Sequence, residues 1–195
     1  MKRSDINRLI KAASASFAKN GHALPPHPRW DVTDFGLGDW SKSGLVLVNL
    51  AEEAEYCEKL MYAQRGMMIP AHTHKRKKED IISRAGVLRV WVWANADLQG
   101  KQEFLLQVDG VKRPVKSGDH VDLQPGSRVT LTPGIYHGFE SVTEECVIGE
   151  VSTANDDVND NFFVNPDIGR YPEIEEDEEP LLWLLSDKNP GGKQS

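Results

Sequence analysis

Three histidines and one glutamate have the residue types and spacing of a site for a divalent metal ion. His72 and His74 are separated by one residue in a stretch that predicts a β-strand. Because side chains alternate along a strand, both imidazoles lie on one face and can reach the same ion. Glu79 follows a short loop and opens the next β-like run, and His137 follows the turn at residues 132–134. The four side chains therefore predict a metal centre.

A single histidine in a strand is more often an ordinary polar residue than a metal ligand. We interpret His22, His27 and His120 in that way. The set of four is different, because packing alone does not account for ligand types at four expected offsets framed by glycines. Three nitrogens and one carboxylate leave two neighbouring positions open on an octahedral ion, which suits Mn, Fe, Co or Ni better than a structural zinc ion. Open positions predict a second ligand that chelates the ion.

The elements that position these side chains begin with an amphipathic helix near the start of the chain. Ser4 is its predicted N-cap and Gly21 its predicted stop. Its apolar positions recur at spacings of three and four, at Ile6, Leu9, Ile10, Ala13 and Phe17. Residues 22–44 contain closely spaced prolines and several turn signals, and they predict a connecting arm without regular structure.

From Gly44 onward, short runs rich in β-branched and aromatic residues alternate with turn formers. The runs cover residues 45–50, 56–65, 80–83, 87–94, 103–108, 119–123, 128–132, 137–142 and 146–152. No helical period separates them, so they predict an antiparallel sandwich or barrel. We expect an N-terminal helix and arm at residues 1–43, a β-barrel domain at 44–153, and an extension at 154–195 that packs on the barrel or on a partner chain.

The charge pattern argues against a nucleic-acid partner. The chain has 195 residues and a net charge of −7, from 23 basic and 30 acidic residues. Most of the acidic excess lies in the run at residues 173–179, which we interpret as a solvated face. A nucleic-acid-binding protein calls for a basic face and a pI well above the value of 5.4 found here.

Hydrophobic patterning and cysteine content indicate a protein of the cytosol. The longest apolar runs, residues 45–48 and 181–185, are far shorter than the ~20 residues of a membrane-spanning helix. No apolar stretch follows the basic residues at the start, so we expect no secretory signal, no membrane partner and a cytoplasmic location. Cys57 and Cys146 lie far apart without a CxxC pair, and we expect two buried thiols rather than a disulfide or a thiolate zinc site.

Two motifs around the metal-binding candidates resemble those of the cupin superfamily. Residues 66–86 match the first cupin motif without a gap: a glycine, five residues, His-x-His, three or four residues, a glutamate, six residues and a glycine. Residues 126–141 resemble the second motif, although Thr132 stands where proline is usual and Ser141 replaces an asparagine. The resemblance implies an all-β fold, a cupin-type antiparallel β-barrel (double-stranded β-helix, or jelly roll) with an N-terminal helix and a C-terminal extension.

Beyond these motifs, nearly the whole chain resembles the D-lyxose ketol-isomerase family. The resemblance rests in combination on residues 72–81, on 133–137, on 149–152 with 155–157, and on 170–178. It implies a metal-dependent aldose–ketose isomerase that interconverts D-lyxose and D-xylulose, with D-mannose and D-fructose as a further candidate pair. It also implies a small-molecule sugar as partner and one divalent ion per subunit, usually Mn²⁺. A homodimer is common among cupins and is expected here.

Isomerisation moves a proton between C1 and C2 of the sugar, so a base must lie close to these carbons. Glu150 interrupts an otherwise apolar run, and we favour a position in the pocket over one facing solvent. Lys77 lies in the loop between two ligands and is a candidate for polarising a sugar oxygen or shuttling its proton, although the basic run 75–78 can equally be a solvated turn. Arg170 can bind distal hydroxyls or pair with the acidic run.

These considerations predict Lys77 and Glu150 as catalytic residues, and Lys77 and Arg170 as substrate-binding residues. They also predict proton transfer through an enediol rather than a hydride shift, because acid–base groups are present. Two other functions stay open from the sequence. One is an Fe(II)-dependent cupin dioxygenase, which would consume oxygen and use the same ligands. The other is a non-catalytic sugar-binding cupin, which would bind ligand without forming product.

Overall fold

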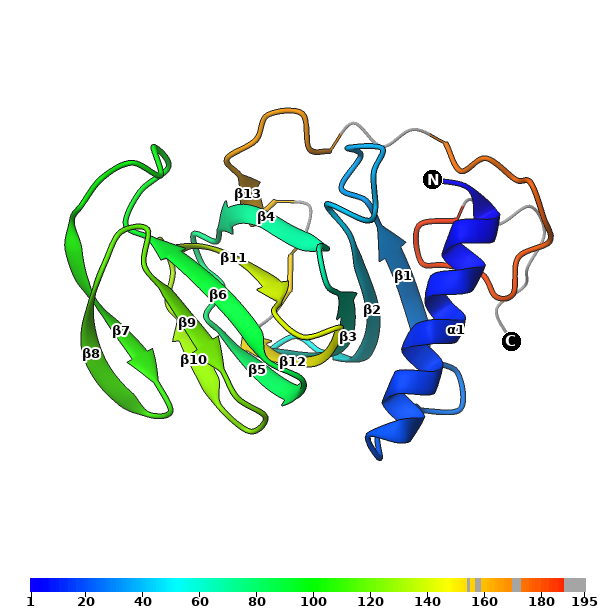
Figure 1. Cartoon of the computed structure of the whole chain (residues 1–195), viewed down its shortest axis with the longest axis horizontal. Helices are drawn as coiled ribbons and strands as arrows, with labels where there is room; N and C mark the ends of the chain where they lie inside the picture. The colour runs from blue at the N-terminus through cyan, green and yellow to red at the C-terminus, as the bar shows by residue number, and fades with distance from the viewer. Residues whose placement is uncertain (154, 157–158, 170–172, 188–195) are drawn as a thin grey trace.

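Two antiparallel β-sheets face each other, and the helix α1 (Arg3–Lys19) lies beside the end of the larger sheet (Figure 1). This computed structural model describes residues 1–153, 155–156, 159–169 and 173–187. The eight-stranded sheet contains, in spatial order, β1 (Arg29–Thr33), β2 (Leu45–Glu52), β3 (Tyr56–Gln64), β12 (Glu145–Thr153), β5 (Glu79–Ala85), β10 (Arg128–Leu131), β7 (Glu103–Val108) and β8 (Val111–Lys116). The five-stranded sheet contains β13 (Phe162–Phe163), β4 (Met68–Thr73), β11 (Tyr136–Ser141), β6 (Leu88–Trp93) and β9 (His120–Leu123).

This arrangement confirms the predicted all-β, antiparallel, cupin-type fold, with one difference in how the sheets meet. The larger sheet has β1 and β8 at its edges, and the smaller sheet has β13 and β9 at its edges. The two sheets therefore form an open sandwich rather than a closed barrel. The inner faces of such a sandwich form the core, and the space between them can hold a ligand.

The alternation along β6 shows how the core is built. Leu88, Val90 and Val92 are completely buried between the sheets. Arg89 and Trp91 point to the outer face, where the Arg89 guanidinium pairs with Asp122 of β9 at 2.7 Å. The period of two that predicted the strands from the sequence therefore also decides which side chains enter the core.

Strand register brings the predicted site residues to one place between the sheets. In the smaller sheet, His137 of β11 pairs with His72 of β4. In the larger sheet, Glu79 is the first residue of β5 and lies opposite Ser152 of β12. Glu150 stands two residues before Ser152, so both side chains leave β12 on the same face. One sheet supplies histidines and the other supplies carboxylates.

Gly138 allows β11 to approach β4 closely enough for this pairing. The register between these strands shifts between His137 and Phe139. A Cβ atom at position 138 would lie 2.8 Å from the carbonyl oxygen of Ile69, which is closer than real Cβ atoms come. Glycine is therefore required beside the histidine for a steric reason, apart from any role in chemistry.

The predicted N-terminal helix is confirmed, but its predicted N-cap is wrong. The five apolar positions named above are all buried, and Gly21 adopts a left-handed φ of +78° just after the helix ends. The helix begins at Arg3, one residue before Ser4, with Lys2 at the cap position. Ser4 instead donates its backbone N–H and its hydroxyl to Asp177, a residue far along the chain. The carboxylate of Asp177 thus satisfies a free N–H group at the start of the helix, which is the role expected of a local cap.

Three strands, β1, β8 and the two-residue β13, occur where the sequence did not predict them. β1 lies inside the stretch 22–44, which was expected to lack regular structure, and it pairs with β2. Its inward residues Trp30 and Val32 are buried, but the strand is only five residues long and follows a proline-rich segment that hides the alternation. β8 is mostly polar and contains Pro114, which an edge strand tolerates.

The acidic run belongs to a segment that crosses the start of α1, which we call the C-terminal strap (residues 173–187; Figure 1). Arg3 is fully buried, and its guanidinium bonds to both Glu176 and Asp187 at 2.7 Å. Other contacts between α1 and the strap are Asn7 Nδ2 to Glu178 Oε1 at 2.6 Å and Asn7 Nδ2 to the Glu179 carbonyl at 2.8 Å. The run is exposed, as predicted, but its carboxylates also hold the N-terminal helix.

We expect Arg3→Met to lower the free energy of unfolding by about 3 kcal/mol, since it leaves the buried Asp187 carboxylate without its partner. Hydrogen bonding to Arg3 lowers the pKa of Glu176. This part of the stabilisation is therefore present above the ordinary glutamate pKa and is lost as the pH falls through the lowered value. Urea unfolding checks both effects. Lys2→Met is the control, because its pair with Glu175 is exposed and 3.9 Å long, and an equal effect of both variants would contradict the prediction.

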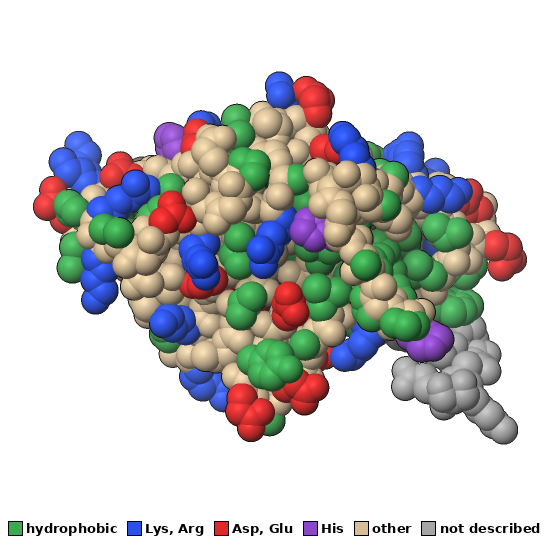
Figure 2. All heavy atoms as spheres, turned by 90° about the horizontal axis from the view of Figure 1, so that it is seen from below, with side chains coloured by type: hydrophobic (Ala, Val, Ile, Leu, Met, Phe, Trp, Pro, Cys, Tyr) green, Lys and Arg blue, Asp and Glu red, His purple; other side chains and the backbone are tan. Residues whose placement is uncertain are grey.

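The surface carries both signs of charge. Figure 2 shows Lys and Arg side chains interspersed with Asp and Glu on the face it displays, without a continuous basic area. Among the described residues, we find no helix with the length and apolar character needed to cross a bilayer. Cys57 and Cys146 are buried free thiols, as predicted.

Candidate metal centre

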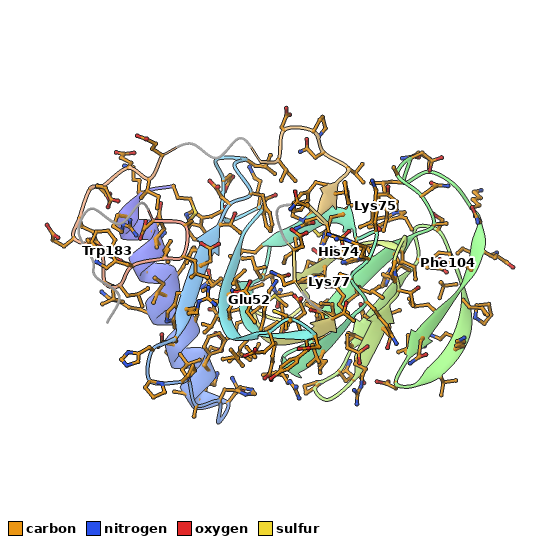
Figure 3. The ribbon with its side chains drawn as sticks, turned by 180° about the vertical axis from the view of Figure 1, so that it is seen from behind. Glu52, His74, Lys75, Lys77, Phe104 and Trp183 are labelled. Atoms are coloured by element: carbon orange, nitrogen blue, oxygen red, sulfur yellow. The ribbon has the colours of Figure 1, made fainter. Side chains whose placement is uncertain are left out.

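The structure brings together the four residues that the sequence singled out as metal ligands. His72, His74, Glu79 and His137 are all buried, and one ligand atom from each lies within 4.8 Å of the others. His72 and His137 come from the smaller sheet, His74 from the residue after β4, and Glu79 from the larger sheet. Figure 3 shows His74 and Lys77 near the middle of the molecule, far from Trp183 in the strap. Such a group can hold a divalent ion.

Each imidazole is held by its Nδ1 atom, which leaves Nε2 for the centre. All three Nδ1 atoms lie against backbone carbonyl oxygens, and a carbonyl can only accept a hydrogen bond. The contacts are His72 with Pro70 at 2.8 Å, His137 with Ile135 at 3.2 Å, and His74 with Asp160. Nδ1 is therefore protonated in each ring, and in a neutral ring Nε2 carries the lone pair. This is the orientation found for histidines that ligate metals.

The atoms at the centre fit a cation. The Nε2 atom of His137 lies 2.7 Å from Glu79 Oε1, and the Nε2 atom of His74 lies 3.5 Å from the same oxygen. These three atoms are buried and none of them makes a hydrogen bond. With Nδ1 protonated, each Nε2 presents a lone pair to a carboxylate oxygen that also carries lone pairs. Such an arrangement is repulsive unless a positive charge lies between the atoms, which a bound metal ion provides.

The electrostatics favour the protonation states that metal ligands need. Burial lowers the pKa of His72 well below its usual value. Burial by itself raises the pKa of Glu79, but that pKa is held well below the usual value, chiefly by the neighbouring Lys77 ammonium group. A neutral imidazole and an ionised carboxylate are the forms that bind metal.

Lys77 joins the candidate metal centre to Glu150. Its Nζ lies 2.8 Å from Glu79 Oε2 and 2.9 Å from Glu150 Oε1, and all three side chains are buried. Burial lowers the pKa of Lys77, but Glu79 and Glu150 outweigh burial and raise that pKa above its usual value. The ammonium group therefore stays charged between two carboxylates. Glu150 lies in the pocket, as favoured from the sequence, and Lys75, Arg76 and Lys78 are exposed as a solvated turn.

A cavity of about 1220 Å³ opens onto this cluster. Its polar lining includes His72, His74, Glu79, Lys77 and Glu150. It is large enough for a pentose or hexose and is lined by imidazole nitrogens, two carboxylates and an ammonium group. Arg170, the other predicted substrate-binding residue, lies outside the described residues.

A family model for D-lyxose isomerase matches residues 28–188 of the chain. The chain belongs to the D-lyxose isomerase family. It is 35% identical to the D-lyxose/D-mannose isomerase of Serratia proteamaculans, over 95% of this chain and 96% of that protein. It is 30% identical to the D-lyxose/D-mannose isomerase of Escherichia coli O157:H7, over 96% of this chain and 98% of that protein. The resemblance seen in the sequence is confirmed.

Solved structures of L-ribose isomerases share the fold of this D-lyxose isomerase family member. The enzyme from an Acinetobacter species in complex with L-ribose superposes with a TM-score of 0.68 at 17% identity, over 87% of this chain and 95% of that one. The enzyme from Geodermatophilus obscurus gives a TM-score of 0.67 at 19% identity, over 86% and 94%. At these identities the likeness establishes the cupin-type fold only.

Lys59 is a residue of the site that the sequence analysis missed. It is buried on β3, and its Nζ lies 3.7 Å from Glu150 Oε1 and 3.1 Å from Asn155 Oδ1. Its backbone pairs with Glu150 across the β3–β12 ladder. A lysine directly before the apolar residues 60–63 of β3 is the only local signal, and its partner is revealed only by the strand register.

Asp160 is a second missed residue in this member of the D-lyxose isomerase family. It is buried, and its carboxylate accepts backbone N–H bonds from Lys75 at 2.9 Å, from Arg76 at 3.1 Å and from Lys77 at 2.9 Å. Its carbonyl oxygen accepts the Nδ1 proton of His74. One residue thus fixes both the ring of a candidate ligand and the loop that carries Lys77.

We expect Asp160→Asn to weaken metal binding by ~10- to 100-fold, the range typical of partners that orient metal ligands. Both carboxylate oxygens accept backbone N–H groups, and an amide NH₂ in place of either oxygen would face a donor. Metal titration by calorimetry measures the affinity. Asp156→Asn is the matched control, since Asp156 pairs with exposed Arg76 at 2.6 Å beside the same loop. Equal affinities for the two variants would show that Asp160 does not position the site.

Proposed function

We propose that this protein is a metal-dependent aldose–ketose isomerase that interconverts D-lyxose and D-xylulose, with D-mannose and D-fructose as a second pair. One observation carries the proposal. A buried cluster of three imidazoles and a carboxylate lies beside the Lys77–Glu150 ion pair, and one cavity is lined by residues of both, His72, His74, Glu79, Lys77 and Glu150. The family and the names of the two relatives support the substrate class. A dioxygenase would have no evident use for this acid–base pair.

His72, His74, Glu79 and His137 would hold the ion, which we propose to be Mn²⁺, one per subunit. When bound, a divalent ion supplies a Lewis acid that stabilises negative charge developing on neighbouring sugar oxygens. The carboxylate donor suits Mn²⁺. The carbonyl partners of the three Nδ1 atoms keep each ring oriented, so the ligands need no rearrangement when the substrate arrives.

In the proposed reaction Glu150 is the base. Its carboxylate takes the proton from C2 of the open-chain aldose and returns it to C1 of the enediol, while a second proton moves from O2 to O1. Lys77 donates hydrogen bonds to the sugar oxygens and carries that second proton between them. Its contact with Glu150 at 2.9 Å also orients the carboxylate. Burial of both groups keeps bulk water away from the enediol.

The proposed proton transfer predicts that solvent deuterium enters C1 of the ketose during turnover of D-lyxose in D₂O. A proton on Glu150 exchanges with solvent in some turnovers, whereas a hydride shift carries the substrate hydrogen directly from C2 to C1. Mass spectrometry and NMR of the product measure the incorporation. Full retention of the substrate hydrogen, together with undiminished turnover by Glu150→Gln, would contradict the mechanism.

The activity itself is tested with metal-loaded protein and D-lyxose or D-mannose, assayed for ketose. We expect ketose with Mn²⁺ and its loss after chelation. Oxygen uptake coupled to turnover would instead support an Fe(II) dioxygenase, and saturable sugar binding without product would support a sensor. We further propose a homodimer acting in the cytoplasm. Sedimentation analysis and cell fractionation test these two points.

A further inference from the structure

The loop between β1 and β2 places a carboxylate with a free oxygen at the wall of the cavity. Asp34 is 5% exposed and lines the same cavity as the candidate metal centre. Its Oδ1 accepts the backbone N–H of Gly36 at 3.0 Å and so holds the turn. Its Oδ2 is buried and has no hydrogen-bond partner. A buried carboxylate oxygen without a hydrogen-bond partner is unfavourable. Oδ2 is therefore suited to accept a hydrogen bond from a bound ligand.

The same loop adopts a conformation that its residue types do not favour. Phe35 follows Asp34 with a φ of +56°, a left-handed conformation that is uncommon for a bulky side chain. The hydroxyl of Thr33 accepts the Phe35 N–H at 2.8 Å and supports this geometry. Backbone strain of this kind is found where a fold holds a functional group in place. Here the group next to the strained residue is the Asp34 carboxylate.

Aromatic contacts tie this loop to the metal centre. The ring of Phe35 lies 5.8 Å from the ring of Phe163, and the ring of Phe163 lies 5.3 Å from the imidazole of His72. Asn161, two residues before Phe163, lines the same cavity, and its Oδ1 is buried without a hydrogen-bond partner. Two residues with unpaired acceptor atoms therefore line the same cavity as the candidate ligands His72, His74 and Glu79.

We propose that Asp34 binds the end of the sugar chain remote from the carbonyl, with Oδ2 accepting a hydrogen bond from the terminal hydroxyl and Asn161 Oδ1 accepting one from its neighbour. This inference rests on the proposed function, because it assumes an open-chain sugar whose C1–C2 end lies at the metal centre. Sugar hydroxyls are donors and both free atoms are acceptors, so the chemistry is complementary. Asp34 is then a specificity-determining residue for chain length and terminal group.

The test compares Asp34→Asn with the unchanged protein on D-lyxose and on 5-deoxy-D-lyxose, both with Mn²⁺ present. The asparagine keeps an oxygen for the Gly36 N–H but puts a donor in place of Oδ2. We expect the variant to raise KM for D-lyxose at least tenfold, with kcat within threefold and metal content unchanged. On the deoxy sugar we expect the two proteins to have equal kcat/KM, since the hydroxyl that Asp34 binds is missing.

The control is Asp39→Asn, in the same connection between strands. Asp39 also holds a turn, by accepting the Ser41 N–H at 3.1 Å, but its side chain is 45% exposed. We expect it to behave like the unchanged protein on both sugars. If Asp34→Asn favours D-lyxose over the deoxy sugar as strongly as the unchanged protein does, the inference is overturned while the proposed function stands. If the unchanged protein converts neither D-lyxose nor D-mannose, the proposed function fails and this inference fails with it.

Discussion

Glu79→Gln is expected to reduce metal affinity by at least about 100-fold and kcat/KM by about 1,000-fold or more. Glu79 is the one anionic member of the four-residue cluster. Its Oε1 faces the Nε2 atoms of His74 and His137, and its Oε2 pairs with Lys77 at 2.8 Å. A glutamine keeps the shape, but it removes the charge that attracts a divalent ion and leaves Lys77 with one carboxylate fewer.

Metal analysis of the purified variant and steady-state kinetics with D-lyxose measure these effects. Glu103→Gln serves as the matched control, because Glu103 has a 68% exposed side chain and a weak pair with Lys116 at 3.7 Å. We expect the control to retain both metal and activity. A Glu79→Gln protein that is fully loaded with metal and fully active would remove this residue from the site.

Glu150→Gln is expected to lower kcat by ~100- to 10,000-fold, the usual contribution of a positioned general base. In contrast to Glu79→Gln, we expect metal content to be unchanged, because Glu150 is not part of the ligand cluster. Its carboxylate is buried between Lys77 at 2.9 Å and Lys59 at 3.7 Å. The glutamine amide has the same size as the carboxylate but cannot accept a proton from carbon. The substitution is therefore expected to lower kcat while metal binding is retained.

The control for this variant is Glu145→Gln on the same strand. Glu145 is the first residue of β12, and its carboxylate contacts Lys19 and the hydroxyl of Tyr62, away from the cavity lining. We expect it to retain kcat. If Glu150→Gln keeps the rate of the unchanged protein, another group takes the proton, and the proposed role of Glu150 is wrong.

The two variants act on opposite sides of Lys77 and are told apart by metal content. Loss of metal together with activity marks a ligand, whereas loss of activity with metal retained marks an acid–base group. This separation matters because Lys77 contacts both carboxylates. A change at Lys77 itself would disturb both carboxylates together.

Those parts of the site that depend on short sequence spacing could be predicted. His72, His74 and Glu79 lie within one strand, loop and strand, so the alternation of side chains and the length of the loop place them near one another. His137 could be added because a turn and a cupin-like motif precede it. The helix near the start was likewise predicted from periodicity, since Ile6 and Phe17 fall on one buried face.

The parts that the sequence did not reveal depend on contacts between distant segments. Lys59 reaches Glu150 only because β3 pairs with β12 in one particular register. Asp160 bonds to the loop at 75–77, which lies more than 80 residues earlier in the chain. Ser4 was expected to cap its own helix, and it binds Asp177 instead. In each case the partner is set by tertiary packing, which local patterns do not encode.

Local sequence patterns also did not reveal the tertiary contacts of Asp34 and of the acidic run. Asp34 lies in a stretch that the prolines marked as irregular, so nothing in the sequence placed it at the cavity. The acidic run has the composition of a solvated segment, and its residues are exposed. Arg3, which binds Glu176 and Asp187, is a single basic residue near the start of the chain, and a buried role for it cannot be inferred from its neighbours.

The most direct measurement is X-ray diffraction at the manganese absorption edge, on crystals of the protein soaked with Mn²⁺ and a polyol that resembles the open-chain sugar. The proposal predicts one anomalous peak per subunit, which marks a manganese ion. We expect the ion to be bonded to the Nε2 atoms of His72, His74 and His137 and to a carboxylate oxygen of Glu79. Two polyol hydroxyls should lie beside it. Diffraction data that show no peak there in excess Mn²⁺, with the four side chains turned away from one another, would contradict it.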